Sequence, residues 1–201
     1  MPRVSQDHLD ARRRQIITAA QRCFAAQGFH ATSMQDVFRE SGLSAGAVYR
    51  YFPSKTALVR TIAGEVLDEL TAELDRAAAD RGDRRAAEVL GEAVRRRFAG
   101  GDLGGLRPMM LQVWAEAVRD QDLREFAREA YARIAAALAG LIAHDVAAGT
   151  LPEGVDCEAA AETLLAVVQG FVVQGSIVGE ARLTALPAAI ETVIAGVTAR
   201  S

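Results

Sequence analysis

The sequence predicts an all-α protein of about nine helices, because its composition and its periodicity both favour helix. Alanine supplies 40 of the 201 residues, and aromatic residues make up only 5%. Alanine loses no side-chain entropy in a helix, so this composition favours helix along most of the chain. Apolar residues also recur at three- and four-residue spacing, which is typical of helices, rather than in the alternation of strands.

The charges of the chain are divided unevenly between its two parts. Residues 1–60 carry nine basic side chains against four acidic ones, whereas residues 61–201 carry fourteen against twenty-two. This asymmetry indicates that the two parts bind different partners. The predicted divisions are a flexible N-terminal arm over 1–8, a small domain over 9–54, a connecting helix over 55–80 and a larger domain over 81–201.

Three short helices are predicted in the small domain, each bounded by residue types that start or stop a helix. Serine and threonine cap helix N-termini, whereas glycine and proline interrupt the helical hydrogen bonds. The first predicted helix is 9–27 and ends at Gly28. The second begins after a cap at either Thr32 or Ser33 and ends at Ser41-Gly42. The third is 45–52, with Ser44 as its cap and Pro53 at its end.

Five further helices are predicted in the larger domain between glycine-rich breaks. The segment 163–179 is apolar around its whole circumference, so we expect it to be buried on more than one side. At 17 residues it is shorter than the roughly 20 that span a bilayer, and no membrane partner is expected. The predicted helices are 84–99, 106–119, 121–148, 156–178 and 185–199.

The last two of these helices are the candidate surface for a homodimer. The segment 163–179 needs a cover, and 185–199 carries an apolar stripe that includes Leu186, Ile190 and Ile194. A two-fold interface formed by both helices would supply that cover. The alternative is that 163–179 is the central core helix of a monomer.

The sequence gives no signal for a disulfide framework, a metal site or an enzyme. Its two cysteines, Cys23 and Cys157, are far apart, which fits a reducing cytoplasm, and residues 1–14 contain no apolar run of a signal peptide. No histidine pair has the spacing of a metal site, and no nucleophile with its base or phosphate loop is apparent. We therefore expect no metal, no cofactor and no enzymatic activity, and a cytoplasmic location.

The small domain contains the pattern of a helix-turn-helix motif. Its second and third helices are both short, and the turn between them contains Gly42. In such motifs the second helix of the pair enters the major groove of DNA, while flanking groups bind phosphates. Residues 45–52 would then be the helix that reads double-stranded DNA.

The run TSMQDVFRESGLSAGAVYRYFPSKTALV, residues 32–59, resembles the DNA-binding signature of the TetR family of transcriptional regulators. The preceding run RRRQIITAAQRCFAAQGFHATS is similar to the first helix of that family. The resemblance covers residues 12–62 in register and extends to the C-terminal part only in the number and length of helices. It implies a C-terminal domain that dimerises and binds a small-molecule effector.

The resemblance also implies which residues face DNA. The hydroxyls of Thr32, Ser33 and Ser44 would meet phosphates at helix N-termini, and Tyr49, Tyr51 and Lys55 would clamp the backbone. Arg50 is the long side chain expected to read a base, with guanine as the usual partner. Met34, together with Gln35, would help to distinguish one DNA sequence from another. The remaining candidates are Ala45, Gly46 and Ala47, whose small side chains can touch a thymine methyl.

Upstream of the motif, residues 12–14 are three consecutive arginines with two open interpretations. They are either an arm that reaches the DNA backbone or minor groove, or simply a solvated helix start. The core of the small domain is predicted to contain Phe24, Val37, Phe38, Val48 and Phe52.

The larger domain holds the bulky side chains that an effector pocket needs, although each can instead be ordinary core. Trp114 is the stronger candidate, since a buried indole N–H needs a partner. The candidate ligand-binding residues are Phe98, Met109, Met110, Gln112, Trp114, Phe126, Tyr131, His144, Gln169, Phe171 and Gln174.

These features together predict a sequence-specific transcriptional regulator. The expected form is a homodimeric repressor that a small-molecule effector releases from a palindromic operator, with half-sites about 34 Å apart. The alternatives are a non-specific or architectural DNA-binding protein, and a helical bundle that binds small molecules without a DNA function.

Overall fold

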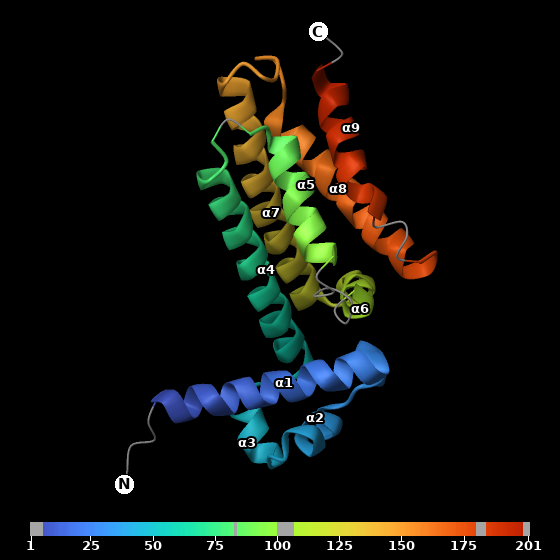
Figure 1. The fold of residues 1–201 in the computed structure, drawn as a ribbon. Helices are drawn as coiled ribbons and strands as arrows, with labels where there is room; N and C mark the ends of the chain where they lie inside the picture. Colours follow the sequence, from blue (N-terminus) through green and yellow to red (C-terminus); the bar gives the residue numbers. More distant parts are fainter. Residues whose placement is uncertain (1–5, 83, 100–106, 180–183, 199–201) are drawn as a thin grey trace. The chain divides into compact units, whose positions relative to one another are not determined.

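The structure is a computed structural model that describes residues 6–82, 84–99, 107–179 and 184–198. Within these residues the chain forms nine α-helices and no strand (Figure 1). The predicted all-α fold is therefore confirmed. The helices are α1 (Gln6–Ala31), α2 (Met34–Ser41), α3 (Ala45–Tyr49), α4 (Lys55–Ala79), α5 (Ala86–Ala99), α6 (Arg107–Ala117), α7 (Gln121–Ala147), α8 (Cys157–Ile177) and α9 (Leu186–Thr198).

Two helices of the small domain have bounds in the structure that differ from the predicted ones. Helix α1 begins at Gln6, inside the predicted arm, and one further turn follows the break at Gly28, where the amide of Thr32 donates to the Gly28 carbonyl at 3.2 Å. Helix α3 ends at Tyr49, and a turn follows in which the amides of Tyr51 and Phe52 both donate to the carbonyl of Val48 at 3.0 Å.

The chain divides into two compact units that do not follow the predicted domain boundaries. The first unit combines Met1–Val66 with Pro108–Ala127, and the second combines Leu67–Arg107 with Arg128–Ser201. Most of α6 and the start of α7 therefore belong to the unit that contains the helix-turn-helix. Helix α4 contributes its first part to one unit and its remainder to the other.

The first unit has a core that fixes α2 and α3 against α1 (Figure 1). Ile16, Val37 and Val48 come from these three helices and are completely buried. The predicted core residues Phe24 and Phe52 are also buried, whereas the predicted core residue Phe38 is only partly buried. Burial of about 25 cal/mol per Å² of apolar surface makes this contact the main stabilisation of the short helices.

The second unit has its own apolar core between α4, α5, α7, α8 and α9. Leu90, Leu141, Leu164 and Ile190 represent four of these helices and are at most 4% exposed. Helices α5 and α9 pack extensively against each other although they are far apart in the sequence. Only part of the circumference of α8 packs against this core.

Helix α8 is less buried than its sequence predicts. Val172 is buried, but Ile177 and the following Val178 are 76% and 67% exposed in the single chain. One copy of the chain therefore covers 163–179 only in part, and its burial on more than one side stays a prediction. By length and composition α7 and α8 could each cross a membrane, but core helices of soluble proteins have the same length and composition. Both helices contribute residues to the apolar core of the second unit.

One buried ion pair stands within the second unit. Arg81 and Asp145 are 5% and 1% exposed, and the Arg81 guanidinium donates to the Asp145 carboxylate. The remaining polar atoms are satisfied, since Arg81 also donates to the Leu141 carbonyl at 3.0 Å and Asp145 accepts from the Ala86 amide at 2.9 Å. Buried charges are tolerated when they are paired in this way.

Candidate functional site

Helix α2 begins with a reciprocal cap formed by Ser33 and Asp36. The Ser33 hydroxyl accepts from the Asp36 amide at 3.3 Å, and the Asp36 carboxylate accepts from the Ser33 amide at 2.8 Å. Of the two predicted cap positions, Ser33 is the one that caps the helix. Hydrogen bonds from the Ser33 hydroxyl and amide lower the pKa of Asp36, since they favour the ionised carboxylate.

The turn between α2 and α3 depends on a left-handed glycine and a second serine cap. Gly42 has φ 69° and ψ 17°, a conformation that residues with a Cβ rarely adopt. The Ser44 hydroxyl then accepts from the Ala47 amide at 3.3 Å and starts α3. Gln15 of α1 donates to the carbonyl of Ser41 at 2.7 Å, which fixes the turn against the first helix.

Helix α3 presents one exposed face above a buried one. Val48 and Phe52 are buried in the core, so the opposite face points to solvent. Tyr49 is 48% exposed, and its ring lies edge-on against Phe38 with centroids 5.3 Å apart. The exposed residues of this segment are Ser44, Ala45, Gly46, Tyr49 and Arg50, whereas Ala47, Tyr51 and Met34 are partly buried.

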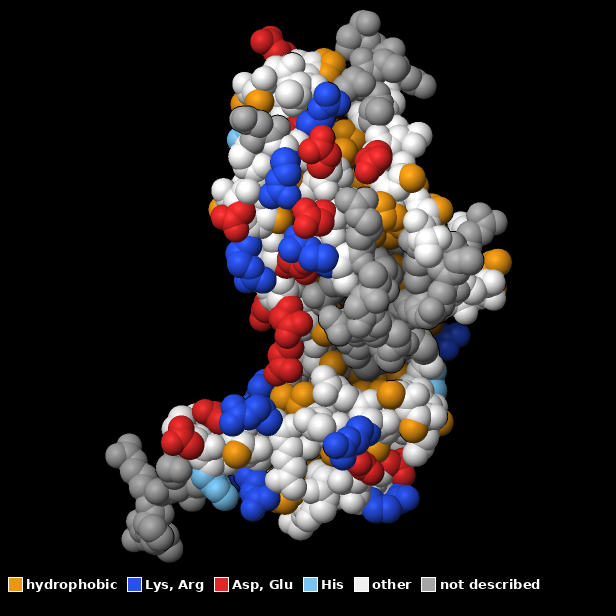
Figure 2. Space-filling view, in the orientation of Figure 1, with side chains coloured by type: hydrophobic (Ala, Val, Ile, Leu, Met, Phe, Trp, Pro, Cys, Tyr) orange, Lys and Arg blue, Asp and Glu red, His pale blue; other side chains and the backbone are white. Residues whose placement is uncertain are grey.

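The basic side chains of the first unit are spread over its surface. On the face drawn in Figure 2, Lys and Arg side chains of this unit lie apart, with uncharged and acidic side chains between them, rather than in one continuous patch. The three arginines of α1 also differ from one another: Arg13 lies 3.2 Å from Glu65, and Arg12 donates to Gln15 at 2.8 Å. Arg14 is exposed on the same helix.

Thr32 does not have the role that the sequence predicts. Its side chain is only 1% exposed, and its hydroxyl lies 2.7 Å from the carbonyl oxygen of Gly28 and 3.2 Å from that of Cys23. A hydroxyl in this position holds the end of α1 and is not available to a phosphate. The prediction of a phosphate contact at Thr32 is corrected accordingly.

Lys55 is also engaged inside the first unit. Its Nζ donates to the carbonyls of Phe29 at 2.7 Å and Thr32 at 3.0 Å, and it lies 4.2 Å from the centroid of the Phe29 ring. Burial lowers the pKa of Lys55, an effect that the nearby carboxylate of Glu116 opposes. The sequence suggested a phosphate clamp, but the structure shows a lysine that caps the last turn of α1.

Two residues of α6 contact the same turn. The Oε1 atom of Gln112 accepts from the amide of Phe29, and Glu116 Oε2 lies 3.5 Å from His30 Nε2. The sequence assigned Gln112 to an effector pocket and gave no sign of this contact. The two partners are 83 positions apart, so no local spacing rule could have found them.

The predicted pocket residues are distributed over both compact units. Met110, Gln112, Trp114 and Phe126 belong to the first unit, while the remainder with described side chains belong to the second. The side chains of Phe98 and Met109 lie outside the described residues. In the second unit Tyr131 is hydrogen-bonded to Gln169, Phe171 packs against the core, and His144 and Gln174 are exposed.

The exposure of His144 corrects one of these predictions. Its neighbour Asp145 points into the core and pairs with Arg81, so His144 lies on the outer side of α7 and does not face a pocket of this unit. Burial raises the pKa of Tyr131, and the hydrogen bond with Gln169, another of the predicted pocket residues, partly offsets this rise.

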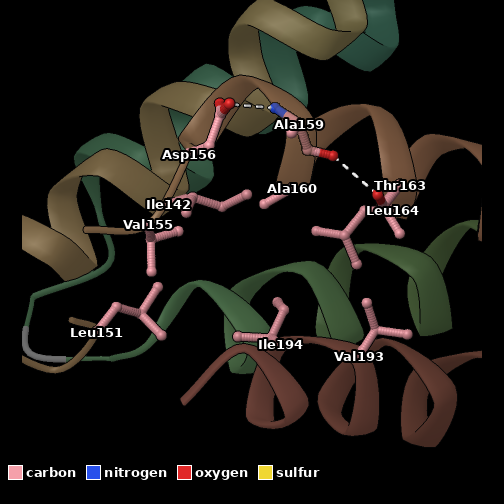
Figure 3. Close-up of a pocket in the computed structure, with 10 residues that line it drawn as sticks. All are labelled: Ile142, Leu151, Val155, Asp156, Ala159, Ala160, Thr163, Leu164, Val193 and Ile194. Atoms are coloured by element: carbon pink, nitrogen blue, oxygen red, sulfur yellow. Dashed lines mark hydrogen bonds between the residues drawn. The ribbon is translucent and has the colours of Figure 1, made fainter. Parts of the chain in front are cut away.

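A different set of residues lines a cavity in the second unit that is partly open to solvent. The cavity has a volume of about 260 Å³ and lies between α7, α8 and α9 (Figure 3). Its two polar side chains are already bonded within α8, because Asp156 caps the helix and the Thr163 hydroxyl donates to the Ala159 carbonyl at 2.8 Å. The lining residues are Ile142, Leu151, Val155, Asp156, Ala159, Ala160, Thr163, Leu164, Val193 and Ile194.

Among the described residues, no group of three histidine, cysteine, aspartate or glutamate side chains is placed to hold a metal ion. Cys23 is buried and Cys157 is partly buried, and both are free thiols.

Comparisons with known proteins match both parts of the chain. A family model described as bacterial regulatory proteins of the tetR family matches residues 16–62, which include α2 and α3. A second model, described as the C-terminal part of BetI-type transcriptional repressors, matches residues 107–199. Together the two models cover most of the chain.

Individual relatives agree with these matches. The HTH-type transcriptional repressor Rv1474c of Mycobacterium tuberculosis is 41% identical over 76 residues, which are 38% of this chain and 41% of the relative. The HTH-type transcriptional regulator TtgR of Pseudomonas putida is 28% identical over 192 residues, covering 86% of this chain and 83% of its own. The first match therefore spans less than half of that relative, whereas the second includes both parts of the fold.

The fold is also similar to a solved structure of a transcriptional regulator, FadR from Bacillus subtilis in complex with stearoyl-CoA. The two share 18% sequence identity with a TM-score of 0.77, over 91% of this chain and 98% of the other. At this identity the likeness concerns the fold.

Proposed function

We propose that this chain, which belongs to the TetR family of bacterial transcriptional regulators, is a homodimeric repressor that a small-molecule effector releases from a palindromic operator. The observation that carries this proposal is the exposed face of α3, held on a core of completely buried side chains and flanked by two serine caps. A rigid helix with small residues at its start can approach the base edges of a major groove. As a DNA-binding regulator the protein would act in the cytoplasm.

Within this face we assign different roles to different residues. Arg50 reads a base, because its exposed guanidinium has no ion-pair partner among the described residues. Tyr49, Tyr51 and the Ser44 hydroxyl hold phosphates, which positions the helix but carries no sequence information. The Ser33 hydroxyl donates to the Asp36 carboxylate, so at this cap the backbone amides at the start of α2 would meet the phosphate. Ala45, Gly46 and Ala47 allow close approach and can contact a thymine methyl, and Met34 lies beside the Ser33 cap.

The test is selection of a preferred sequence from a random duplex library by the purified protein. We expect a palindrome, and we expect Arg50→Ala to relax the preference at one position of each half-site by about 1–3 kcal/mol. Tyr49→Ala should weaken binding to all sequences alike. Arg133→Ala removes the same charge from an exposed arginine of the second unit and serves as the control.

The outcome also separates the proposal from its alternative. If wild-type protein enriches no sequence, the chain is a non-specific DNA-binding protein. If it binds no DNA at all, only the helical bundle and its cavity are left to carry a function.

We further propose that the effector is a small, mainly apolar molecule that binds in the second unit. The cavity between α7, α8 and α9 supports this proposal, since its two polar side chains are internally bonded and leave apolar atoms to meet a ligand. A volume of about 260 Å³ exceeds the roughly 150 Å³ that suffices for benzene. The stearoyl-CoA of FadR shows that an acyl chain is bound by a protein with this fold.

Toluene, octanol and decanoate are suitable probes of the cavity. We expect one of them to raise the melting temperature and to release operator DNA, and we expect Ala160→Phe to abolish both effects by filling the cavity. Thr150→Ser, at an exposed position outside the lining, is the control. Release that persists in Ala160→Phe would place the effector elsewhere, with the Tyr131–Gln169 pair as the next candidate.

The dimer is proposed to form through α8 and α9. The large exposed fractions of Ile177 and Val178 at the end of α8 support this, because a second copy of the chain would remove these apolar side chains from water. Light scattering should show a dimer for wild-type protein and a monomer for Ile177→Asp. Val118→Asp, which changes an equally exposed valine in the first unit, should leave the dimer intact.

A further inference from the structure

We infer that Gln112 is a positioning residue for DNA binding, although it lies outside the helix-turn-helix. Its side-chain carbonyl accepts from the amide of Phe29 and thereby completes the turn from which α2 starts. The inference rests on the proposed DNA-binding function and adds to it a residue of α6. All of the groups involved belong to the first compact unit.

The need for Gln112 arises at the break in α1. Gly28 has φ 79° and ψ 169°, so the helix is interrupted there and the next amide cannot continue the helical series of hydrogen bonds. That amide belongs to Phe29, whose side chain is 4% exposed. An unpaired amide in such a position is costly, and the Oε1 atom of Gln112 is the acceptor that satisfies it.

Gly28 and Gln112 also fit each other sterically. A Cβ atom built on Gly28 would lie 2.7 Å from Nε2 and 2.9 Å from Oε1 of Gln112, closer than real side-chain contacts allow. The glycine is required for its backbone conformation, and the absence of a Cβ lets the side-chain amide of Gln112 lie in the place it occupies.

The turn that follows Gly28 is held by further side chains from two helices. Lys55 of α4 donates to the carbonyls of Phe29 and Thr32, and Glu116 of α6 lies 3.5 Å from His30. Glu116 is one helical turn beyond Gln112, so the same face of α6 supplies both contacts. The backbone of this turn has its amide and carbonyl partners on α6 and α4 rather than within α2 and α3.

The consequence for DNA binding follows from chain connectivity. The turn ends at Thr32, and the next residue, Ser33, is the cap of α2. A change in the turn therefore alters where α2 begins, and α2 supports α3 through the buried Val37 and Val48. Gln112 acts on the DNA-reading face through the turn and needs no contact with DNA.

The inference predicts that the acceptor atom at position 112 is what matters. Gln112→Leu keeps the size of the side chain and removes the acceptor, whereas Gln112→Glu keeps an acceptor. We expect the leucine variant to show at least about tenfold faster hydrogen exchange at the Phe29 amide and about tenfold weaker operator binding. The glutamate variant should stay within about twofold of wild type in both measurements.

The measurements separate this inference from the proposed function. Hydrogen exchange at Phe29 is read by NMR without DNA, and operator binding is measured on the sequence that wild-type protein selects. A leucine variant that binds the operator like wild type, or a glutamate variant as defective as leucine, overturns the inference and leaves the proposed function standing.

Two other outcomes are failure of the wild-type protein to select a DNA sequence and failure of the leucine variant to fold. If wild-type protein selects no sequence, the proposed function fails and the DNA role of Gln112 fails with it, whatever the exchange data show. If the leucine variant does not fold, Gln112→Ala removes the same acceptor without adding apolar bulk and is judged by the same two readouts.

Discussion

The two compact units are stabilised by polar contacts of different kinds. In the first unit many side chains each bond to backbone atoms: Ser33 and Ser44 cap helices, Thr32 and Lys55 hold the end of α1. Among the described residues of the second unit, one ion pair has both side chains buried, and this pair, Arg81 with Asp145, joins the start of α5 to the end of α7. The other polar contacts of this unit, such as the Asp156 cap and the Arg133–Asp68 ion pair, involve more exposed side chains.

This difference suits the functions proposed for the two units. A DNA-reading face has to be fixed in shape although its helices are too short to be stable alone, and caps fix them residue by residue. A bundle of long helices is stabilised mainly by its apolar core, so few of its polar groups need to be buried. Removing one polar group should therefore cost more in the second unit than in the first.

The largest effect is expected for Asp145→Ala. The substitution leaves the Arg81 guanidinium buried without its carboxylate and the Ala86 amide without an acceptor, so the free energy of unfolding should fall by about 3–5 kcal/mol. His144→Ala changes the exposed neighbour and should alter it by less than about 0.5 kcal/mol. Urea unfolding of both variants checks this, and similar values for the two would refute a special role for the pair.

The same contrast explains what the sequence could predict. The caps at Ser33 and Ser44 act on residues three positions away, and the turn at Gly42 shows in its own residue type, so local patterns found them. The number of helices followed from alanine content and spaced breaks, and every helix beyond α4 was placed within about two residues of its observed ends.

Contacts between distant positions could not be predicted in this way. Arg81 and Asp145 are 64 positions apart, and the sequence suggested only a turn at the former. Gln112 and Phe29 are 83 positions apart, so Gln112 was assigned to a pocket on the basis of its type alone. Thr32 and Lys55 have polar groups that could bind a phosphate, and only the fold shows that these groups instead donate hydrogen bonds to backbone carbonyls.

A smaller effect is expected for Lys55→Met, which tests whether this residue belongs to the scaffold or to the DNA contacts. Loss of two hydrogen bonds from a charged donor should lower the free energy of unfolding by about 1–3 kcal/mol. The slope of log K against log salt for operator binding should not change, because no phosphate contact is lost.

Arg22→Ala is the control for Lys55→Met. Its side chain is 70% exposed in an ion pair with Glu40, so stability should change by less than about 0.5 kcal/mol. A fall of about one in the salt slope for Lys55→Met, without loss of stability, would instead assign the lysine to a phosphate.

The cap of α2 should contribute less than either of these contacts. Ser33→Ala removes the acceptor for the Asp36 amide and should lower the free energy of unfolding by about 1 kcal/mol. Ser33→Asn keeps an acceptor and should stay within a few tenths of wild type, in keeping with roughly equal cap preferences. Chemical denaturation of both variants checks the prediction, and equal losses would show that the hydroxyl is not the stabilising group.

The smallest effect concerns the ionisation of Asp36. Hydrogen bonds from the Ser33 hydroxyl and amide lower its pKa in the folded state, with Arg39 contributing less. A lowered pKa means that the folded state binds the proton more weakly, so the resulting stabilisation is present above the unfolded value near 3.9 and is lost as pH falls through the folded value. NMR titration should show the pKa of Asp36 rising towards its usual value in Ser33→Ala and rising less in Arg39→Ala. The reverse order would mean that the arginine, rather than the cap, holds the carboxylate ionised, and the local contacts of the first unit would then be electrostatic instead of hydrogen-bonded.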